Sequence, residues 1–227
     1  MTKDEIISKE ADLIVHTYRR PDFVLERGKG CYLYDTEGNR YLDLVAGIAV
    51  NNLGYGDPEV LEAIASQAEK LIHVSNLYHM RPHIELAEQL VEASFADKVY
   101  FCNSGTEAVE AAIKFARKWG KTRFSPLKYE LVAFSKSFHG RTLGALSLTH
   151  REHYRLPFEP LLPGTSFATF NDLASAEAAV GENTCAVIVE PVQGEGGINP
   201  ADGDFLSGLR ELCNRRKALL IFDEVQC

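Results

Sequence analysis

From residue 99 to residue 224 the sequence alternates short apolar runs with segments of helical periodicity. The segments 105–119 and 203–216 repeat apolar residues every three or four positions, which is typical of amphipathic helices. Such an alternation predicts an α/β fold, a mostly parallel sheet with helices on both of its faces. The runs that we expect to form its strands are 99–102, 130–134, 167–170, 185–189 and 218–222.

The first 57 residues carry a different pattern. Residues 32–34 face residues 41–42 across a turn that contains Gly38, which predicts a β-hairpin with a longer loop. We assign residues 1–57 to a small N-terminal α+β segment and residues 58–227 to the first part of a larger domain.

Two amphipathic helices are expected after this segment. Asp57 is a good N-cap residue and Pro58 suits the first helical position, so the first helix should run from Pro58 to near Leu71. The second helix is expected from His83 to near Ser94.

Composition argues against several classes of function. Of the 227 residues 45% are hydrophobic and 25% are charged, which is ordinary for a globular protein. The net charge of -8 makes a nucleic-acid partner a poor expectation. The five cysteines form no C-x-x-C pair, no stretch resembles a signal peptide, and none is apolar enough to cross a membrane. We therefore expect a reduced, cytoplasmic protein.

Polar residues gather where the predicted strands end. After residue 102, Ser104 and Glu107 fit a capping box, and Gly105 leaves the backbone free to turn into the helix. A helix N-terminus of this kind is an anion site, above all for phosphate. The alternative is a plain helix cap.

Two further clusters follow the second and the fourth of these runs. Phe138, His139 and Arg141 offer an aromatic ring, an imidazole and a guanidinium fork that matches a carboxylate, unless they form an ordinary surface loop. Glu190 fits a simple strand terminator. Glu195 lies in the glycine loop GEGG, which leaves little side chain to cover it, so we expect Glu195 to face a cleft.

Asp223 directly follows the last run. A carboxylate at the inner end of a buried strand is costly unless a cation or hydrogen bonds compensate it, and a pyridinium nitrogen would be such a cation. Together the four clusters offer a phosphate cradle, a ring to stack on, a carboxylate clamp and an anion for a protonated ring nitrogen. This combination matches pyridoxal 5′-phosphate (PLP) bound beside an amino-acid substrate.

The motifs also resemble a known family, the class III, ornithine-type aminotransferases, and within it the acetylornithine aminotransferases of arginine biosynthesis. The resemblance covers nearly the whole chain and implies the fold of the PLP-dependent transferases of fold type I. The segments that carry it are GIAVNNLGYGDPEV, HVSNLY, FCNSGTEAVEAAIKFARK, FHGRTLGALS, VEPVQGEGGI and LLIFDEVQC.

The resemblance implies a role for each of several cofactor-binding residues. The backbone at Gly105 and Thr106 would bind the cofactor phosphate, and Phe138 would stack on one face of the ring while Val225 packs on the other. Asp223 would pair with the ring nitrogen and keep it protonated. Two further residues of the same segment are expected at the cofactor: Glu224, and Gln226 near the ring hydroxyl.

The resemblance also implies the substrates. Arg141 would hold the α-carboxylate of N-acetylornithine, and Glu195 resembles the residue that masks or frees a second arginine so that glutamate is accepted too. The δ-amino group of N-acetylornithine would pass to 2-oxoglutarate, giving N-acetylglutamate 5-semialdehyde and glutamate. The family forms homodimers, and neither a membrane nor a nucleic acid takes part. Other amines of the family, namely ornithine, succinylornithine, succinyldiaminopimelate, 4-aminobutyrate and carrier-linked lysine intermediates, stay open.

The sequence has no position for the lysine to which this family attaches the cofactor, nor for the C-terminal domain. We therefore expect an N-terminal part of an aminotransferase that is inactive by itself and contains no catalytic residue of its own. Lys136 also lies near a predicted strand end, but the resemblance gives it no role, and a solvated lysine is the simpler interpretation.

Two rival functions fit parts of the sequence. A P-loop ATPase also has an apolar strand that ends in Asp-Glu, but it needs G-x-x-x-x-G-K-[ST], and the only Gly-Lys-Thr, at Gly120, has Phe115 in place of the first glycine. The other rival is a non-catalytic module that binds phosphate or cofactor. No metal is expected, because the histidine pairs bring no cysteine or carboxylate ligands with them. These pairs are His79 with His83 and His150 with His153.

Overall fold

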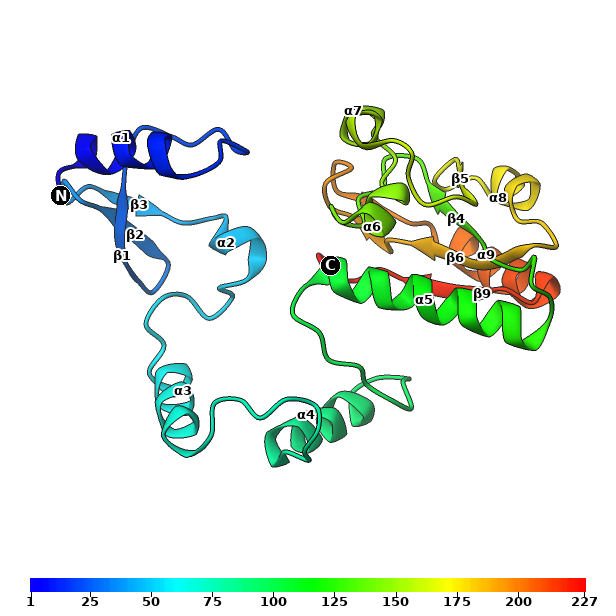
Figure 1. Cartoon of the computed structure of the whole chain (residues 1–227), viewed down its shortest axis with the longest axis horizontal. Helices are drawn as coiled ribbons and strands as arrows, with labels where there is room; N and C mark the ends of the chain where they lie inside the picture. Colours follow the sequence, from blue (N-terminus) through cyan, green and yellow to red (C-terminus); the bar gives the residue numbers. More distant parts are fainter. The chain divides into compact units, whose positions relative to one another are not determined.

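The computed structural model describes residues 1–227, and the chain forms two compact units, Met1–Leu86 and Ala87–Cys227 (Figure 1). The division falls within helix α4 (Arg81–Glu92). The boundary that the sequence suggests after residue 57 lies inside the first unit, directly before helix α3 (Pro58–Lys70).

The first unit contains a three-stranded antiparallel sheet of order β1-β2-β3. The predicted hairpin is confirmed, since Tyr32 lies opposite Leu42 and Leu33 lies opposite Tyr41. Besides α3 and the start of α4, the elements of this unit are α1 (Lys3–Leu13), β1 (Leu25–Lys29), β2 (Tyr32–Asp35), β3 (Arg40–Leu42) and α2 (Ala46–Ala49).

One buried carboxylate closes the hairpin. Asp35 is 3% exposed and accepts hydrogen bonds from the N–H groups of Glu37 and Asn39, from the Asn39 amide and from the Tyr41 hydroxyl, at 2.7–3.0 Å. Burial by itself would raise the pKa of Asp35, but these hydrogen bonds together lower it to about 2. The turn is therefore held by an ionised side chain.

Both helices predicted after the N-terminal segment are confirmed. The Asp57 carboxylate accepts hydrogen bonds from the N–H groups of Glu59 at 3.0 Å and Val60 at 3.1 Å, so that α3 has the expected cap. The second helix, α4, begins at Arg81 rather than His83.

The second unit is built on a four-stranded parallel sheet of order β5-β4-β6-β9. The predicted βαβ alternation is confirmed in this part. The elements in chain order are α5 (Gly105–Arg123), β4 (Glu130–Phe134), α6 (Leu143–Ser147), α7 (Glu152–Arg155), the 3-10 helix η1 (Leu156–Phe158), β5 (Thr165–Ala168), α8 (Leu173–Ala179), β6 (Thr184–Val189), β7 (Val192–Gln193), β8 (Asn199–Pro200), α9 (Gly203–Arg216) and β9 (Leu219–Phe222).

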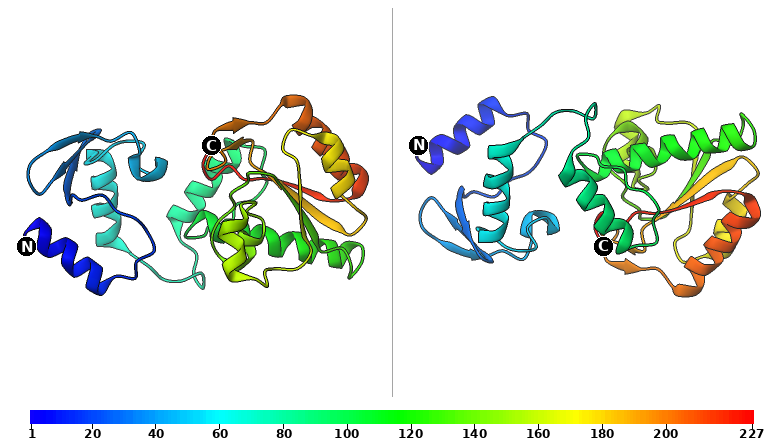
Figure 2. Two further views of the ribbon diagram at one scale, coloured as in Figure 1. Left: turned by 90° about the horizontal axis from the view of Figure 1, so that it is seen from above. Right: turned by 90° about the horizontal axis from the view of Figure 1, so that it is seen from below.

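Helices cover both faces of this sheet (Figure 2). Successive strand residues point to opposite faces, and each face has its own core. On one face α8 and α9 pack on Val132, Phe134, Val187 and Val189, and on the other α5 and α6 pack on Leu131, Ala133, Ala186 and Ile188. Strand β6 is buried along its whole length, as expected of a central parallel strand. None of the helices is both long enough and apolar enough to span a membrane.

Two strand predictions need correction. Residues 99–102 form no strand, because an apolar run becomes one only where a neighbouring strand takes its backbone hydrogen bonds, and no strand pairs with this run. Tyr100 stays 63% exposed and packs edge-on against Phe115 of α5, with ring centroids 5.6 Å apart. The strand expected at 167–170 is β5, which begins earlier, at Thr165, where it pairs with Leu131.

Candidate active site

The carboxyl ends of β4, β6 and β9 lie at one edge of the parallel sheet, because the three strands are neighbours and run in the same direction. The segments 135–142, 190–198 and 223–227 therefore leave the sheet at this edge. In open α/β folds such an edge is where ligands bind.

The start of α5 has the predicted cap. The Ser104 hydroxyl accepts a hydrogen bond from the N–H group of Glu107 at 3.3 Å, and the backbone of Ser104 is extended. The Glu107 carboxylate accepts from the N–H group of Asn103, at 2.6 Å, rather than from that of Ser104, so only one half of the predicted box forms. The first N–H groups of α5, at Gly105 and Thr106, have no acceptor within the helix and carry the positive end of its dipole.

Close contacts bring this helix start to the other segments. A Cβ on Gly105 would lie 2.5 Å from a methyl carbon of Val225, and a Cβ on Gly140 would lie 2.4 Å from the Thr106 hydroxyl oxygen. Gly140 also has a φ of 126°, which L side chains rarely adopt. Both glycines are thus required by how closely the segments 105–106, 138–142 and 223–227 approach one another.

A polar network that the sequence did not indicate supports this approach. The Thr106 and Thr142 hydroxyl oxygens are 3.0 Å apart, and the Glu110 carboxylate accepts hydrogen bonds from the Thr142 hydroxyl and, at 3.1 Å, from the N–H group of Ala145. Thr106 and Glu110 are one helical turn apart on α5, a spacing that places them on the same face. This spacing is the one sign of the network in the sequence. Thr142, which contacts both Thr106 and Glu110, is distant from them in sequence.

The most buried charged contact of the site joins His139 to Asp223. Their Nδ1 and Oδ2 atoms are 2.7 Å apart, and the two side chains are 0% and 7% exposed. We assign the proton to Nδ1, since an ionised carboxylate can only accept. The backbone N–H group of His139 is in turn held by the Thr149 hydroxyl at 2.9 Å, while its Nε2 is buried without a hydrogen-bond partner.

Arg141 lies among aromatic rings. Its guanidinium carbon is 5.7 Å from the centroid of the Phe138 ring and 5.0 Å from that of Tyr154, within the range of cation–π attraction. The side chain forms no ion pair, so its fork is free to take an anion. Tyr154, on α7, was not singled out from the sequence.

The remaining predicted residues lie on neighbouring loops. Glu195 is exposed, and its backbone carbonyl accepts a hydrogen bond from Arg151 at 2.8 Å. A Cβ on Gly194 would lie 2.7 Å from Gln226, which places Gln226 beside the GEGG loop. Glu224 is exposed at the end of β9, and Lys136 has a positive φ of 63°.

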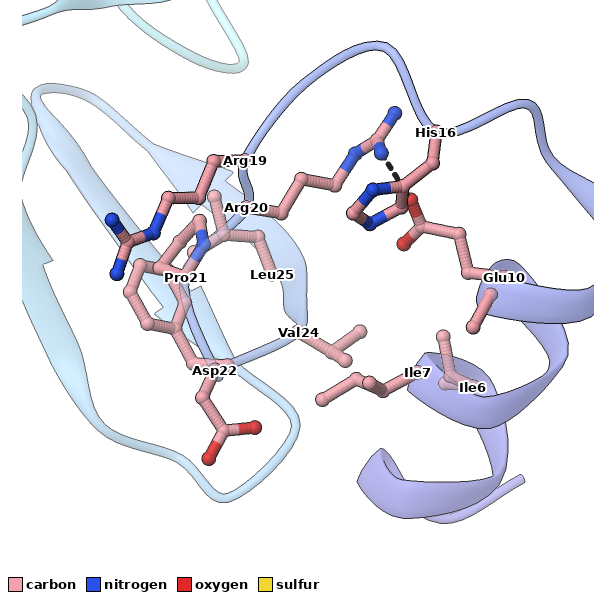
Figure 3. A pocket seen from close by; sticks show the side chains of 12 residues that line it. Ile6, Ile7, Glu10, His16, Arg19, Arg20, Pro21, Asp22, Val24 and Leu25 are labelled. Carbon is pink, nitrogen blue, oxygen red and sulfur yellow. Dashed lines mark ion pairs between the residues drawn. The ribbon is translucent and has the colours of Figure 1, made fainter.

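Outside this edge of the sheet, the other candidates for a site are a pocket in the first unit, the Gly-Lys-Thr run and a metal site. A pocket of about 560 Å³ in the first unit has apolar walls from Ile6, Ile7 and Val24, and its rim carries the exposed ion pair between Glu10 and Arg20, at 2.6 Å (Figure 3). The Gly-Lys-Thr run of the P-loop rival lies inside helix α5, not in a loop. No three His, Cys, Asp or Glu side chains are placed to share a metal ion.

Comparison with known proteins gives one family. The family model for aminotransferase class III matches residues 14–227. The chain is 51% identical to the mitochondrial acetylornithine aminotransferase of Alnus glutinosa, over 98% of this chain and 50% of that protein. It is 52% identical to the succinylornithine transaminase of Yersinia enterocolitica, over 94% of this chain and 53% of that protein. The chain thus spans about half the length of the curated relatives it matches.

Among solved structures, the chain resembles the ornithine aminotransferase of Toxoplasma gondii with a TM-score of 0.93 and 30% identity, over 99% of this chain and 54% of that chain. That crystal structure reveals partial occupancy of PLP at the active site of the protein. The predicted fold, a parallel sheet with flanking helices as in the PLP-dependent transferases, is therefore confirmed.

Proposed function

Because the chain belongs to the class III aminotransferase family, we propose that its strand-end site binds pyridoxal 5′-phosphate and serves the transfer of an amino group. The observation that carries the proposal is the buried contact of 2.7 Å between His139 and Asp223 beside the start of α5. An acidic group so fixed, next to a helix N-terminus, suits a ligand with a cationic ring nitrogen and a phosphate.

The residues present fit this cofactor. The free N–H groups at Gly105 and Thr106 suit the phosphate, and the absence of a Cβ at Gly105 lets Val225 approach the same place. Phe138 would stack on one face of the ring and Val225 on the other, with Gln226 near the ring hydroxyl and Glu224 on the adjoining segment. When bound, PLP supplies an electron sink for the carbon next to the reacting amino group.

Asp223 acts on the ring nitrogen in this proposal. Its Oδ1 accepts from the N–H group of Val225 at 3.2 Å and its Oδ2 from His139, so the carboxylate is held in one orientation. An oriented anion that is largely shielded from water, as the Asp223 side chain is, keeps a nearby ring nitrogen protonated more effectively than one in bulk water. His139 therefore acts through Asp223 and not on the ring itself.

Arg141 is proposed to hold the substrate. Its guanidinium fork matches the α-carboxylate of an amino acid, and the rings of Phe138 and Tyr154 limit where the fork points. Glu195, exposed on the GEGG loop, is proposed to adjust the site when the substrate is glutamate.

We propose N-acetylornithine as the donor and 2-oxoglutarate as the acceptor, with N-acetylglutamate 5-semialdehyde and glutamate as products, in arginine biosynthesis in the cytoplasm and in a homodimer. Relatives named for acetylornithine and for succinylornithine match the chain almost equally, at 51% and 52% identity. Succinylornithine is therefore the second candidate, and the size of the acyl group is what an experiment must decide.

The substrate assignment is tested by titrating the chain, saturated with pyridoxine 5′-phosphate, with N-acetylornithine, succinylornithine and ornithine in a calorimeter. Pyridoxine 5′-phosphate lacks the aldehyde and cannot label lysines at random. We expect N-acetylornithine to bind most tightly and Arg141→Met to weaken it by about tenfold or more, the loss of a charged hydrogen-bonded pair. Arg210→Met, an exposed change on α9, is the control. An equal effect of both variants, or no binding of the cofactor analogue, would refute the proposal.

A further inference from the structure

Glu190, the residue directly after β6, is a buried carboxylate that forms no ion pair. It is 6% exposed. Its Oε2 accepts a hydrogen bond from the N–H group of Phe138 at 3.1 Å, and its Oε1 accepts from the N–H group of Gly194 at 3.4 Å. The sequence alone suggests no more than a strand terminator at this position.

A strand end does not need such a residue. Burial raises the pKa of Glu190, since it disfavours the charged form. The nearby imidazole of His139 and the two N–H groups act in the opposite direction, and the carboxylate of Asp223 raises the pKa further. A buried carboxylate beside a second carboxylate is costly, whereas water molecules would satisfy the same N–H groups at lower cost.

The two hydrogen bonds join loops that leave different strands. Phe138 belongs to the loop after β4 and precedes His139, which holds Asp223. Gly194 directly follows β7, in the turn that leads to β8, contacts Gln226 and precedes Glu195. Glu190 is therefore linked on one side to the ring that faces the cofactor and on the other side to the loop that faces the substrate.

We propose that Glu190 is a positioning residue of the site: its carboxylate fixes the backbones of Phe138 and Gly194, so that the Phe138 ring and the GEGG loop keep their places relative to Asp223. This inference rests on the proposed function, because Phe138 and Asp223 are taken to face the cofactor ring. The contacts that build the phosphate end, between Thr106 and Thr142 and between Gly105 and Val225, do not involve Glu190. Loss of the Glu190 carboxylate should therefore weaken binding of the cofactor ring and leave binding of a phosphate unchanged.

The first test follows amide hydrogen exchange in the chain without ligand. In Glu190→Gln one carboxylate oxygen becomes an NH₂ group, which cannot accept, so one of the two N–H groups at Phe138 and Gly194 should exchange about tenfold faster or more. Glu190→Ala should release both. Glu182→Gln, at the opposite end of β6 and with a side chain 92% exposed, is the matched control and should change neither. Unchanged exchange at both amides in Glu190→Ala would overturn the inference.

The second test compares two probes, pyridoxine 5′-phosphate and inorganic phosphate. Glu190→Ala should weaken binding of pyridoxine 5′-phosphate by about tenfold, the effect of one hydrogen bond to a charged group, and leave the affinity for inorganic phosphate unchanged. An equal loss for both probes would mean a collapsed site and would overturn the inference. If the unmodified chain does not bind pyridoxine 5′-phosphate, the proposed function fails, while the exchange experiment still decides whether Glu190 fixes the two loops.

Discussion

The contact between His139 and Asp223 gives a sharp prediction about how the site is built. Its atoms are 2.7 Å apart, and the side chains are 0% and 7% exposed. The perturbations are Asp223→Asn, which keeps the shape and one acceptor oxygen but removes the charge, His139→Ala, and the two together.

The expected magnitudes follow from these contacts. A hydrogen bond to a charged group contributes about 1.5–3 kcal/mol and a neutral one about 0.5–1.5 kcal/mol, so Asp223→Asn alone should cost about 1 kcal/mol. His139→Ala leaves the buried carboxylate with one hydrogen bond, from the N–H group of Val225, and removing one partner of a buried pair costs about 3–5 kcal/mol. In that background Asp223→Asn removes the uncompensated charge, so it should be neutral or stabilising.

Urea-induced unfolding, followed by circular dichroism, gives the free energy of unfolding of all four proteins. We expect a coupling of at least about 1 kcal/mol between the two positions, whereas independent positions add to within about 0.3–0.5 kcal/mol. Asp204→Asn, an exposed change on α9, is the control. If Asp223→Asn costs the same with and without His139, the two groups do not depend on each other and the reasoning is refuted.

Three further changes test other parts of the structure. Gly140→Ala places a Cβ 2.4 Å from the Thr106 hydroxyl oxygen at a φ of 126°, so urea unfolding should show a loss of about 1–3 kcal/mol; no loss would contradict the close approach. Because burial raises the pKa of Glu190, the folded chain keeps a proton that the unfolded chain has lost, and the free energy of unfolding should fall as the pH rises through that raised pKa. Glu190→Gln should flatten this fall. An unchanged pH profile in Glu190→Gln would exclude Glu190 as its source. Asp35, whose pKa is lowered to about 2, has the opposite sign: its contribution to stability should be lost as the pH falls below about 4 toward 2. Hydrogen exchange should show this as a loss of protection at the Asn39 amide, and Asp35→Asn should abolish that pH dependence. The same pH dependence in Asp35→Asn would mean that other groups hold the turn.

Much of the second unit could be predicted because its pattern is strong. The run at 185–189 is apolar at every position, and it became the fully buried part of β6. The cap of α5 at Ser104 was likewise visible as a local motif. Helix α1 was missed although Thr2 and Glu5 form a capping box. Its sequence shows no clear apolar stripe, and in the structure the helix buries no residue.

Contacts between residues that are far apart in the sequence could not be predicted. His139 and Asp223 were each singled out, yet their contact joins residues 84 positions apart and exists only because β4, β6 and β9 end at one edge of the sheet. Glu110 and Thr142 were missed for the same reason, since neither belongs to a motif by itself. Residues 99–102 show the reverse, an apolar run that local propensity favours as a strand but to which no strand pairs.

The proposed function depends above all on Asp223 binding the ring nitrogen of the cofactor. The measurement that tests it most directly is the affinity of the chain, and of Asp223→Asn, for pyridoxine 5′-phosphate and for its 1-deaza analogue, in which a C–H group replaces the ring nitrogen. We expect the unmodified chain to prefer the nitrogen-containing ring by about tenfold or more, as for a charged hydrogen bond, and Asp223→Asn to lose most of that preference. The same preference in both proteins, or none in either, would contradict the account.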